Sequence, residues 1–144
     1  MKLNLGCGNN YLDGYINVDI NHKVKCDVSM DFEKGKFPWK SGEVDEIIAE
    51  MVVEHIWNID HFMNECWRVL KKGGQMLITT PTAGTIAYWK DPTHVKGFVE
   101  QTFRYYADWN TDAANKRKTW NIVHIYTYMP GDENEFIECL MEKP

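Results

Sequence analysis

The chain has 144 residues, a formal net charge of −5 and four cysteines, none of which form a C-x-x-C pair. We expect one domain over residues 1–144, because this length suffices to bury a single core. The negative charge argues against nucleic acid as the main partner, and the cysteine spacing against a zinc site or a disulfide framework. No apolar stretch reaches membrane-spanning length and the chain starts directly in a strand-like run, so we expect no membrane contact and a cytoplasmic location.

Short apolar runs separated by short connections dominate the first third of the chain. Strands are predicted over residues 2–5, 15–20, 26–31 and 44–50. A helical crossover between parallel strands needs a dozen or more residues, and the first two connections are shorter than that. The third, 32–43, is a loop with Pro and Gly and without helical periodicity. The helices that normally cover one face of a parallel sheet should therefore be reduced or missing.

The remaining elements are predicted from capping and turn residues. Asn58 can cap a helix whose apolar positions fall at helical spacing, namely Phe62, Cys66, Val69 and Leu70. The run 71–74 (KKGG) is expected to end this helix, and a strand then extends to Pro81. Two further strand-like runs, 121–129 and 135–141, flank a Pro-Gly turn and predict a hairpin.

The segment around the first two strands indicates a ligand site. The first strand runs into Gly6-Cys7-Gly8-Asn9, and the second ends at Asp19. Glycine lets the backbone approach a ligand closely, and a carboxylate can accept both hydroxyls of a ribose. This combination predicts a nucleotide-type ligand at the carboxyl ends of the strands. The third glycine of a dinucleotide fingerprint is absent, which disfavours an NAD-binding module.

With Glu54-His55, the run 68–74 (RVLKKGG) and the run 91–94 (DPTH) added, the chain resembles the class I S-adenosylmethionine-dependent methyltransferases. It looks closest to a compact subgroup, and the resemblance covers about residues 2–100 and, more loosely, the rest. It implies an α/β, Rossmann-like, mostly parallel sheet with an antiparallel C-terminal hairpin strand. It also implies S-adenosylmethionine as the cofactor.

The resemblance also implies roles for individual residues. The glycine loop would lie against the methionine and ribose portion of the cofactor, and Asp19 would take the ribose hydroxyls. Asp31 with Phe32 would address the adenine, although Asp27 could hold that place instead. Glu50 and Met51, at the end of the fourth strand, would line the methionine side. The expected cofactor residues are Gly6, Cys7, Gly8, Asn9, Asp19, Asp31, Phe32, Glu50 and Met51.

Chemistry is predicted at two histidines. His55 follows the fourth strand and His94 lies in the loop after the fifth, so both are candidate catalytic bases for an O or N atom of a small-molecule or sugar-like acceptor. A catalytically inactive S-adenosylmethionine- or S-adenosylhomocysteine-binding protein or partner subunit is the alternative. We expect no metal, since neither spacing pair, His61 with Glu65 or Asp91 with His94, has an evident third ligand.

The shortened connections also predict how the uncovered sheet face is protected. A parallel sheet is usually covered on both faces, and a large exposed apolar patch is uncommon in monomers. Either loop aromatics cover this face, with Tyr11, Phe37 and Trp39 as candidates, or a second copy of the chain does. We favour a homodimer, because two-fold dimers are the commonest closed assembly.

Overall fold

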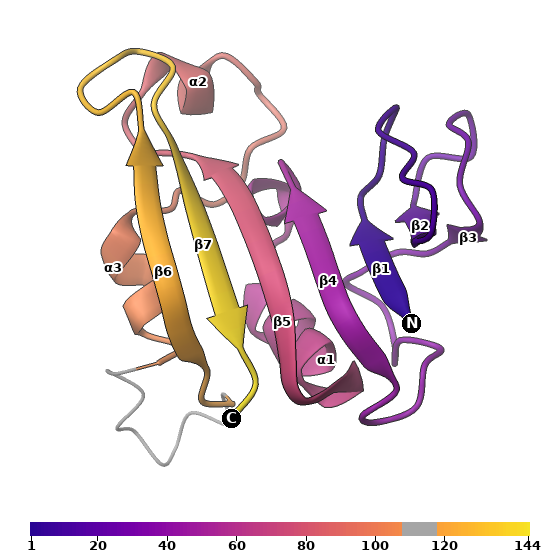
Figure 1. Cartoon of the computed structure of the whole chain (residues 1–144). Helices are drawn as coiled ribbons and strands as arrows, with labels where there is room; N and C mark the ends of the chain where they lie inside the picture. The colour runs from indigo at the N-terminus through magenta and orange to yellow at the C-terminus, as the bar shows by residue number, and fades with distance from the viewer. Residues whose placement is uncertain (108–117) are drawn as a thin grey trace.

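The computed structural model describes residues 1–107 and 118–144, and its centre is a sheet with strand order β3-β2-β1-β4-β5-β7-β6 (Figure 1). The parallel part contains β1 (Lys2–Leu5), β2 (Ile16–Asp19), β3 (Val28–Ser29), β4 (Val44–Glu50) and β5 (Leu70–Pro81). Strand β7 (Phe136–Glu142) runs antiparallel to both β5 and β6 (Asn121–Tyr128). The predicted mostly parallel sheet with an antiparallel C-terminal hairpin is therefore confirmed.

The strand bounds agree with prediction to within a residue except at β3 and at the start of β5. Strands β1 and β4 have the predicted bounds, whereas β3 keeps only two residues of the predicted six. The side chain of Asp27 accepts the backbone N–H of Asn17 at 2.8 Å, so this donor is not available to a carbonyl of the neighbouring strand. A side-chain hydrogen bond of this kind competes with the sheet ladder and shortens it.

Helix α1 (Ile59–Val69) begins where predicted and ends earlier. The Asn58 side chain accepts a hydrogen bond from the N–H of His61, which caps the first turn. The prediction that residues 71–74 end the helix is wrong. Leu70 already has extended backbone and pairs with Val44, and the pairing then jumps to Gln75 opposite Glu46. The run 71–74 is accordingly a bulge within β5, stabilised by tertiary pairing that local sequence does not reveal.

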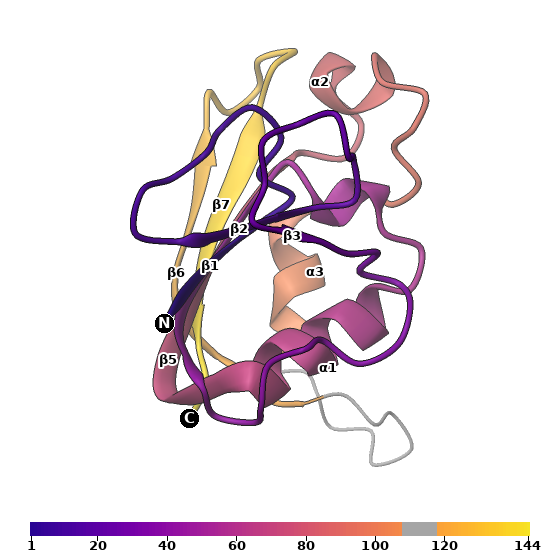
Figure 2. The same ribbon diagram turned by 90° about the vertical axis from the view of Figure 1, so that its right-hand side faces the viewer.

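Within residues 1–107 and 118–144, the helices lie on one side of the sheet or at its upper rim (Figure 2). They are the 3-10 turn η1 (Val53–His55), α1, α2 (Ile86–Trp89) and α3 (Glu100–Arg104). The crossovers 6–14 and 21–25 contain no helix, as predicted. Asparagines hold the first of them instead: Asn4 donates to the carbonyl of Asn10, and the Asn17 side chain binds the backbone of Leu12. In the described part of the chain, no helix is both long and apolar enough to cross a membrane.

The loop 32–43 packs on the helix side of the sheet, where it joins the core. Phe37 and Trp39 are 2% and 8% exposed, and the Phe37 ring lies 6.1 Å from that of Phe62 on α1. Arg68 donates to the carbonyls of Phe37 and Trp39, and Glu65 accepts the N–H of Phe37. Arg68 and Glu65 of α1 form an ion pair, and together they anchor the loop to the helix. The expectation that Phe37 and Trp39 cover the opposite face is therefore wrong.

The opposite side of the sheet, called the open face here, carries a narrow apolar row. Ile48, Leu77 and Leu140 stand next to one another across β4, β5 and β7 and are half-buried. Acidic positions lie beside this row on the same face, namely Glu46, Glu50, Glu138 and Glu142, and the exposed Tyr126 of β6 lies opposite Glu138. The patch is thus smaller than the strand count suggests, and association of two copies through it stays a prediction.

Candidate functional site

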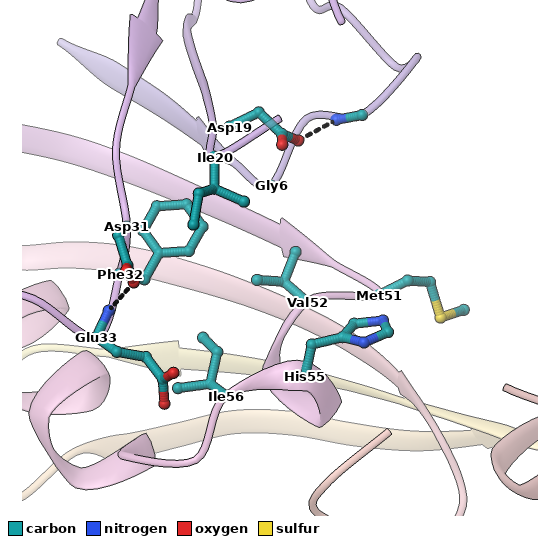
Figure 3. Close-up of a pocket in the computed structure, with 11 residues that line it drawn as sticks. Gly6, Asp19, Ile20, Asp31, Phe32, Glu33, Met51, Val52, His55 and Ile56 are labelled. Atoms are coloured by element: carbon teal, nitrogen blue, oxygen red, sulfur yellow. Dashed lines mark hydrogen bonds between the residues drawn. The ribbon is translucent and has the colours of Figure 1, made fainter. Parts of the chain in front are cut away.

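Two adjoining pockets open at the carboxyl ends of the parallel strands. The first has a volume of about 360 Å³ and is drawn in Figure 3; its lining is Gly6, Gly8, Asp19, Ile20, Asp31, Phe32, Glu33, Met51, Val52, His55 and Ile56. The second has a volume of about 340 Å³ and is lined by Met51, Glu54, His55, Pro81, Ala87, Lys90, Asp91, His94, Asn134 and Phe136. Because Met51 and His55 line both, a group bound in one pocket can reach a group bound in the other.

The glycine loop forms one wall of the first pocket. Gly6 has a φ of +68°, and a Cβ built on it would lie 2.2 Å from Cγ2 of Val52. Any other residue would require the Val52 side chain to move and would have to adopt a left-handed backbone. The N–H of Gly6 donates to the carbonyl of Val18 at 2.8 Å, which joins the loop to β2. Glycine at this position therefore lets the loop, β2 and the β4 terminus meet in one place.

Asp19 ends β2 and is the acid around which the first pocket is organised. Its Oδ2 accepts the N–H of Gly8 and its Oδ1 that of Asn21, both at 2.8 Å. Each carboxylate oxygen can accept about two hydrogen bonds, so both keep acceptor capacity for a ligand. Ile20, which sequence reasoning did not select, is 56% exposed and lines the pocket beside this carboxylate (Figure 3).

The two candidate acids after β2 are separated by the structure. Asp31 lines the first pocket, where the Lys34 ammonium at 2.8 Å and the N–H of Glu33 hold the pKa of its carboxyl below the usual range. Asp27 lies outside that lining and binds Asn17 and the hydroxyl of Tyr11. Of the two sequence alternatives, only Asp31 faces the pocket.

Three of the residues expected at the cofactor lie outside the lining. Cys7 is buried with its Sγ 3.7 Å from the carbonyl of Lys25, and burial raises the pKa of its thiol. Asn9 is exposed, and Glu50 accepts a hydrogen bond from the side chain of Asn10. The structure brings the other six together: Gly6, Gly8, Asp19, Asp31, Phe32 and Met51.

Four lining residues were not selected from the sequence. They are Ile20, Glu33, Val52 and Ile56. Ile20 directly follows Asp19, and Glu33 directly follows Phe32, so adjacency to a predicted site residue was the available signal. The same signal exists for Val52, which follows Met51, and for Ile56, which follows His55.

Met51 separates the two pockets in an unusual backbone conformation. Its φ is 52°, a region that side chains other than glycine, asparagine and aspartate seldom occupy, and its N–H donates to the carbonyl of Thr79 at 2.8 Å. Such strain is of order 1 kcal/mol or more and is found most often where a side chain has a function. Met51 is 46% exposed and lines both pockets together with His55 (Figure 3).

The second pocket brings the two predicted histidines together with an acid that was not predicted. The rings of His55 and His94 have centroids 4.7 Å apart. The backbone N–H groups of Val95 and Lys96 both donate to the carbonyl of Glu54, which holds the His94 loop against η1. The Glu54 side chain is buried, and burial raises the pKa of its carboxyl.

Of the two residue pairs whose spacing was considered for a metal, only one comes together in the structure. His61 and Glu65 have other partners, since the imidazole of His61 lies 2.8 Å from the carbonyl of Gly35 and Glu65 binds Arg68. Asp91 and His94 do approach one another, with Oδ2 and Nε2 3.8 Å apart. Glu54 is the third group that the sequence did not reveal.

Part of this chain is similar in sequence to known proteins. A "Probable S-adenosylmethionine-dependent methyltransferase" of Mycolicibacterium smegmatis is 32% identical over 77 residues, 54% of this chain and 26% of that protein. A mitochondrial "Ubiquinone biosynthesis O-methyltransferase" of Rattus norvegicus is 41% identical over 44 residues, 31% of this chain and 13% of that protein. The chain thus spans about a quarter, or less, of the length of these curated relatives.

The fold comparison covers nearly the whole chain. A crystal structure of an S-adenosylmethionine-dependent methyltransferase from Archaeoglobus fulgidus superposes with a TM-score of 0.76 at 16% identity, covering 99% of this chain and 85% of that one. The sequence also matches the family described as "Methyltransferase domain" over residues 3–78, which is more than half of the 144 residues. The stretch contains the glycine loop, Asp19 and the Glu54-His55 pair, so the chain belongs to the methyltransferase domain family, as its resemblance to the class I enzymes implies.

Proposed function

We propose that this protein transfers a methyl group from S-adenosylmethionine to an oxygen or nitrogen atom of a small-molecule or sugar-like acceptor. The observation that carries the proposal is the pair of adjoining pockets that share Met51 and His55. One pocket has the glycine loop with Asp19, and the other has two histidines. Pockets of about 300–1,000 Å³ are typical of small-ligand sites, and each pocket lies within this range.

The residues of the first pocket suit a cationic nucleoside. Its lining includes the carboxylates of Asp19, Asp31 and Glu33, of which Asp31 is paired with Lys34, and contains no Lys or Arg. Such a lining disfavours a pyrophosphate and favours a ligand that carries positive charge. S-adenosylmethionine is such a ligand and supplies, when bound, a methyl group on a positively charged sulfur. Asp19 has acceptor capacity for ribose hydroxyls, and Ile20 offers apolar surface beside it.

The second pocket would receive the acceptor. An oxygen acceptor loses its proton as it is methylated, and His55 and His94 are side chains there that can act on that atom. The rat relative bears the name of an O-methyltransferase, which supports an oxygen acceptor. The net charge of −5 makes a nucleic-acid acceptor unfavourable. A cytoplasmic location stays a prediction from the sequence.

A binding protein without transferase activity is the second candidate. The observation that favours it is the absence of helices from the crossovers 6–14 and 21–25, which leaves the open face without a helical layer. Such a chain could bind the cofactor and act as a subunit of a larger assembly. The two candidates agree on cofactor binding and differ only in turnover.

Calorimetry with S-adenosylhomocysteine tests the cofactor assignment. Asp19→Asn should weaken binding at least tenfold, since a hydrogen bond to a charged group contributes about 1.5–3 kcal/mol. Asp27→Asn is the matched control: it also removes a carboxylate that accepts a backbone N–H, but outside the pocket lining. It should lower stability and leave the affinity unchanged. Wild-type affinity in folded Asp19→Asn would refute the assignment.

Turnover distinguishes the two candidates. Formation of S-adenosylhomocysteine should be measured with panels of phenols, sugar hydroxyls and amines at saturating S-adenosylmethionine. Acceptor-dependent formation supports a transferase, whereas tight cofactor binding without turnover on any panel supports the binding protein. NADH in the same calorimeter should give no heat of binding, since the acidic lining offers nothing to its pyrophosphate.

A further inference from the structure

Glu54, His55 and His94 form a cluster at the floor of the second pocket. Glu54 and His55 belong to η1, and His94 comes from the loop that follows α2. One ligand atom from each residue, a carboxylate oxygen or a ring nitrogen, lies within 4.8 Å of the other two. The cluster therefore has the composition of two histidines and one carboxylate, which is used by catalytic zinc sites and by non-haem iron sites.

Both histidines are held through one ring nitrogen and leave the other available. Nδ1 of His94 lies 2.6 Å from the carbonyl oxygen of Tyr88, and because a carbonyl can only accept, this nitrogen carries the hydrogen. Nδ1 of His55 lies 3.0 Å from Oγ1 and 3.3 Å from the carbonyl of Thr93. The Thr93 hydroxyl is in turn fixed by Asp91 at 2.7 Å. Metal-binding histidines are commonly anchored in this way, through backbone carbonyls and hydrogen-bonded side chains.

Glu54 supplies the buried charge of the cluster. Its Oε2 accepts a hydrogen bond from the hydroxyl of Thr80 at 3.0 Å, whereas its Oε1 has no hydrogen-bond partner, with the side chain 1% exposed. A buried carboxylate oxygen without a partner is costly, so a group that pairs with it is expected. Oε1 is directed at the free nitrogen of His94, Nε2, which lies 3.9 Å away.

The ligand atoms are wider apart than around a bound ion. Nε2 of His94 is 3.9 Å from Glu54 Oε1 and 3.8 Å from Asp91 Oδ2, and both distances are too long for a hydrogen bond. Two ligands at about 2.1 Å from a tetrahedral zinc ion are about 3.4 Å apart, so atoms that lie within 4.8 Å of one another would have to approach by up to about 1.4 Å to hold the ion. A neutral imidazole nitrogen and a carboxylate oxygen both offer lone pairs, and a cation between them satisfies both.

We infer that Glu54, His55 and His94 bind a divalent transition-metal ion, with zinc as the reference ion, and that its remaining coordination positions face the second pocket. The carboxylate of Asp91 is near enough to the His94 nitrogen to support the ion. The inference replaces the expectation from the sequence that no metal is used. Glu54 and His55 are neighbours in the chain, and the fold brings His94, 40 positions after Glu54, next to them.

The site would also narrow the acceptor class, and this step rests on the proposed function. A cation beside the acceptor lowers the pKa of a hydroxyl, so an alcohol or phenol oxygen is favoured over an amine. The acceptor oxygen then forms a bond to the methyl carbon as the sulfur–carbon bond breaks. The electron pair of that bond stays on sulfur. Because both histidines hold the ion in this arrangement, the hydroxyl proton leaves to water and not to an imidazole.

Metal binding should be measured on chelator-treated protein without any acceptor. Calorimetric titration with Zn²⁺ should give one ion per chain, and Co²⁺ should give visible absorption bands without a thiolate charge-transfer band. Glu54→Gln and His94→Ala should each weaken the Zn²⁺ affinity at least tenfold. Glu54→Gln is close to isosteric and can keep the Thr80 hydrogen bond, so it should remain folded, which circular dichroism checks. His22→Ala, at an exposed histidine remote in sequence from the cluster, should bind as wild type does.

The outcomes separate this inference from the proposed function. Absence of Zn²⁺ binding by the wild type, or an unchanged affinity in folded Glu54→Gln, overturns the metal site and leaves a proton shared by the cluster as the explanation. A thiolate band with Co²⁺ overturns it as well, since the ion would then bind at cysteine. S-adenosylhomocysteine binding is measured on the same samples: if it fails while Zn²⁺ binds, the proposed function is wrong and the metal site stands.

Discussion

Replacing Gly6 by alanine should destabilise the protein far more than the same change at Gly8. Both glycines have positive φ, +68° and +49°, and both belong to the loop after β1. A Cβ on Gly6 would lie 2.2 Å from a methyl carbon of Val52, whereas a Cβ on Gly8 would meet nothing within 4 Å. The two substitutions therefore share the conformational cost and differ in the steric one.

The magnitudes follow from these two terms. A left-handed backbone costs an L-residue about 1–2 kcal/mol, which is the whole expected loss for Gly8→Ala. An added methyl in a packed site costs about 1–3 kcal/mol more, because Val52 is β-branched and has few alternative rotamers. Gly6→Ala should thus lose about 2–5 kcal/mol in total. In a Val52→Ala background the 2.2 Å contact disappears and only the Val52 Cβ remains, 3.3 Å away, so Gly6→Ala should then cost little more than Gly8→Ala.

Urea denaturation of the four variants and the wild type measures these differences as free energies of unfolding. A favourable coupling of about 1–3 kcal/mol is expected between Gly6→Ala and Val52→Ala. Equal losses for Gly6→Ala and Gly8→Ala, or additive effects of the Gly6 and Val52 changes, would refute this expectation. Either result would mean that the loop after β1 moves away from Val52 without cost.

Three further predictions concern single features. Met51→Gly should leave the free energy of unfolding unchanged or raise it by up to about 1 kcal/mol, because glycine suits the backbone at this position. The same change should weaken S-adenosylhomocysteine binding. A loss of stability would contradict this prediction. Hydrogen bonds from Arg68 lower the pKa of the Glu65 carboxyl, so its stabilisation is present above the unfolded pKa and lost as pH falls through the folded value. Glu65→Gln should accordingly cost about 3 kcal/mol near neutral pH in urea titrations and match the wild type in acid, and a gap that persists in acid would argue against this pair. Light scattering should detect a dimer of the wild type. High salt should favour this dimer, because salt screens the acids of the open face, and Leu77→Glu should abolish it. A wild-type monomer at every salt and protein concentration rules the dimer out.

Sequence patterns were sufficient wherever a structural cause is local. The cap at Asn58, the strand that ends at Asp19 and the Pro-Gly hairpin each depend on residues within a few positions, and each is present in the structure. The end of α1 is not local, because Leu70 leaves the helix to pair with Val44 across the sheet. Phe37 likewise packs where a buried ion pair on α1 holds its backbone, which composition cannot indicate.

The same distinction between local and distant causes applies to the residues of the candidate site. Residues that flank a glycine or an acid at a strand end, such as Gly8 and Asp31, could be selected because parallel strands all end at one edge. Glu54 was not selected as a site residue, since the sequence offers no reason to bury it, and its partners Thr80 and His94 lie 26 and 40 positions away. An interaction between distant loops is visible only once the fold has placed them together.

The missing helices and the acidic first pocket are physically consistent. A helix after β1 would direct the positive end of its dipole at the ligand, which stabilises a pyrophosphate and is unfavourable for a cation. Here that segment is a loop tied down by Asn4 and Asn17, and carboxylates line the pocket instead. A site built this way can bind a positively charged nucleoside without a helical layer over β1 and β2. The uncovered face over β1 and β2 is therefore compatible with the ligand chemistry that the pocket serves.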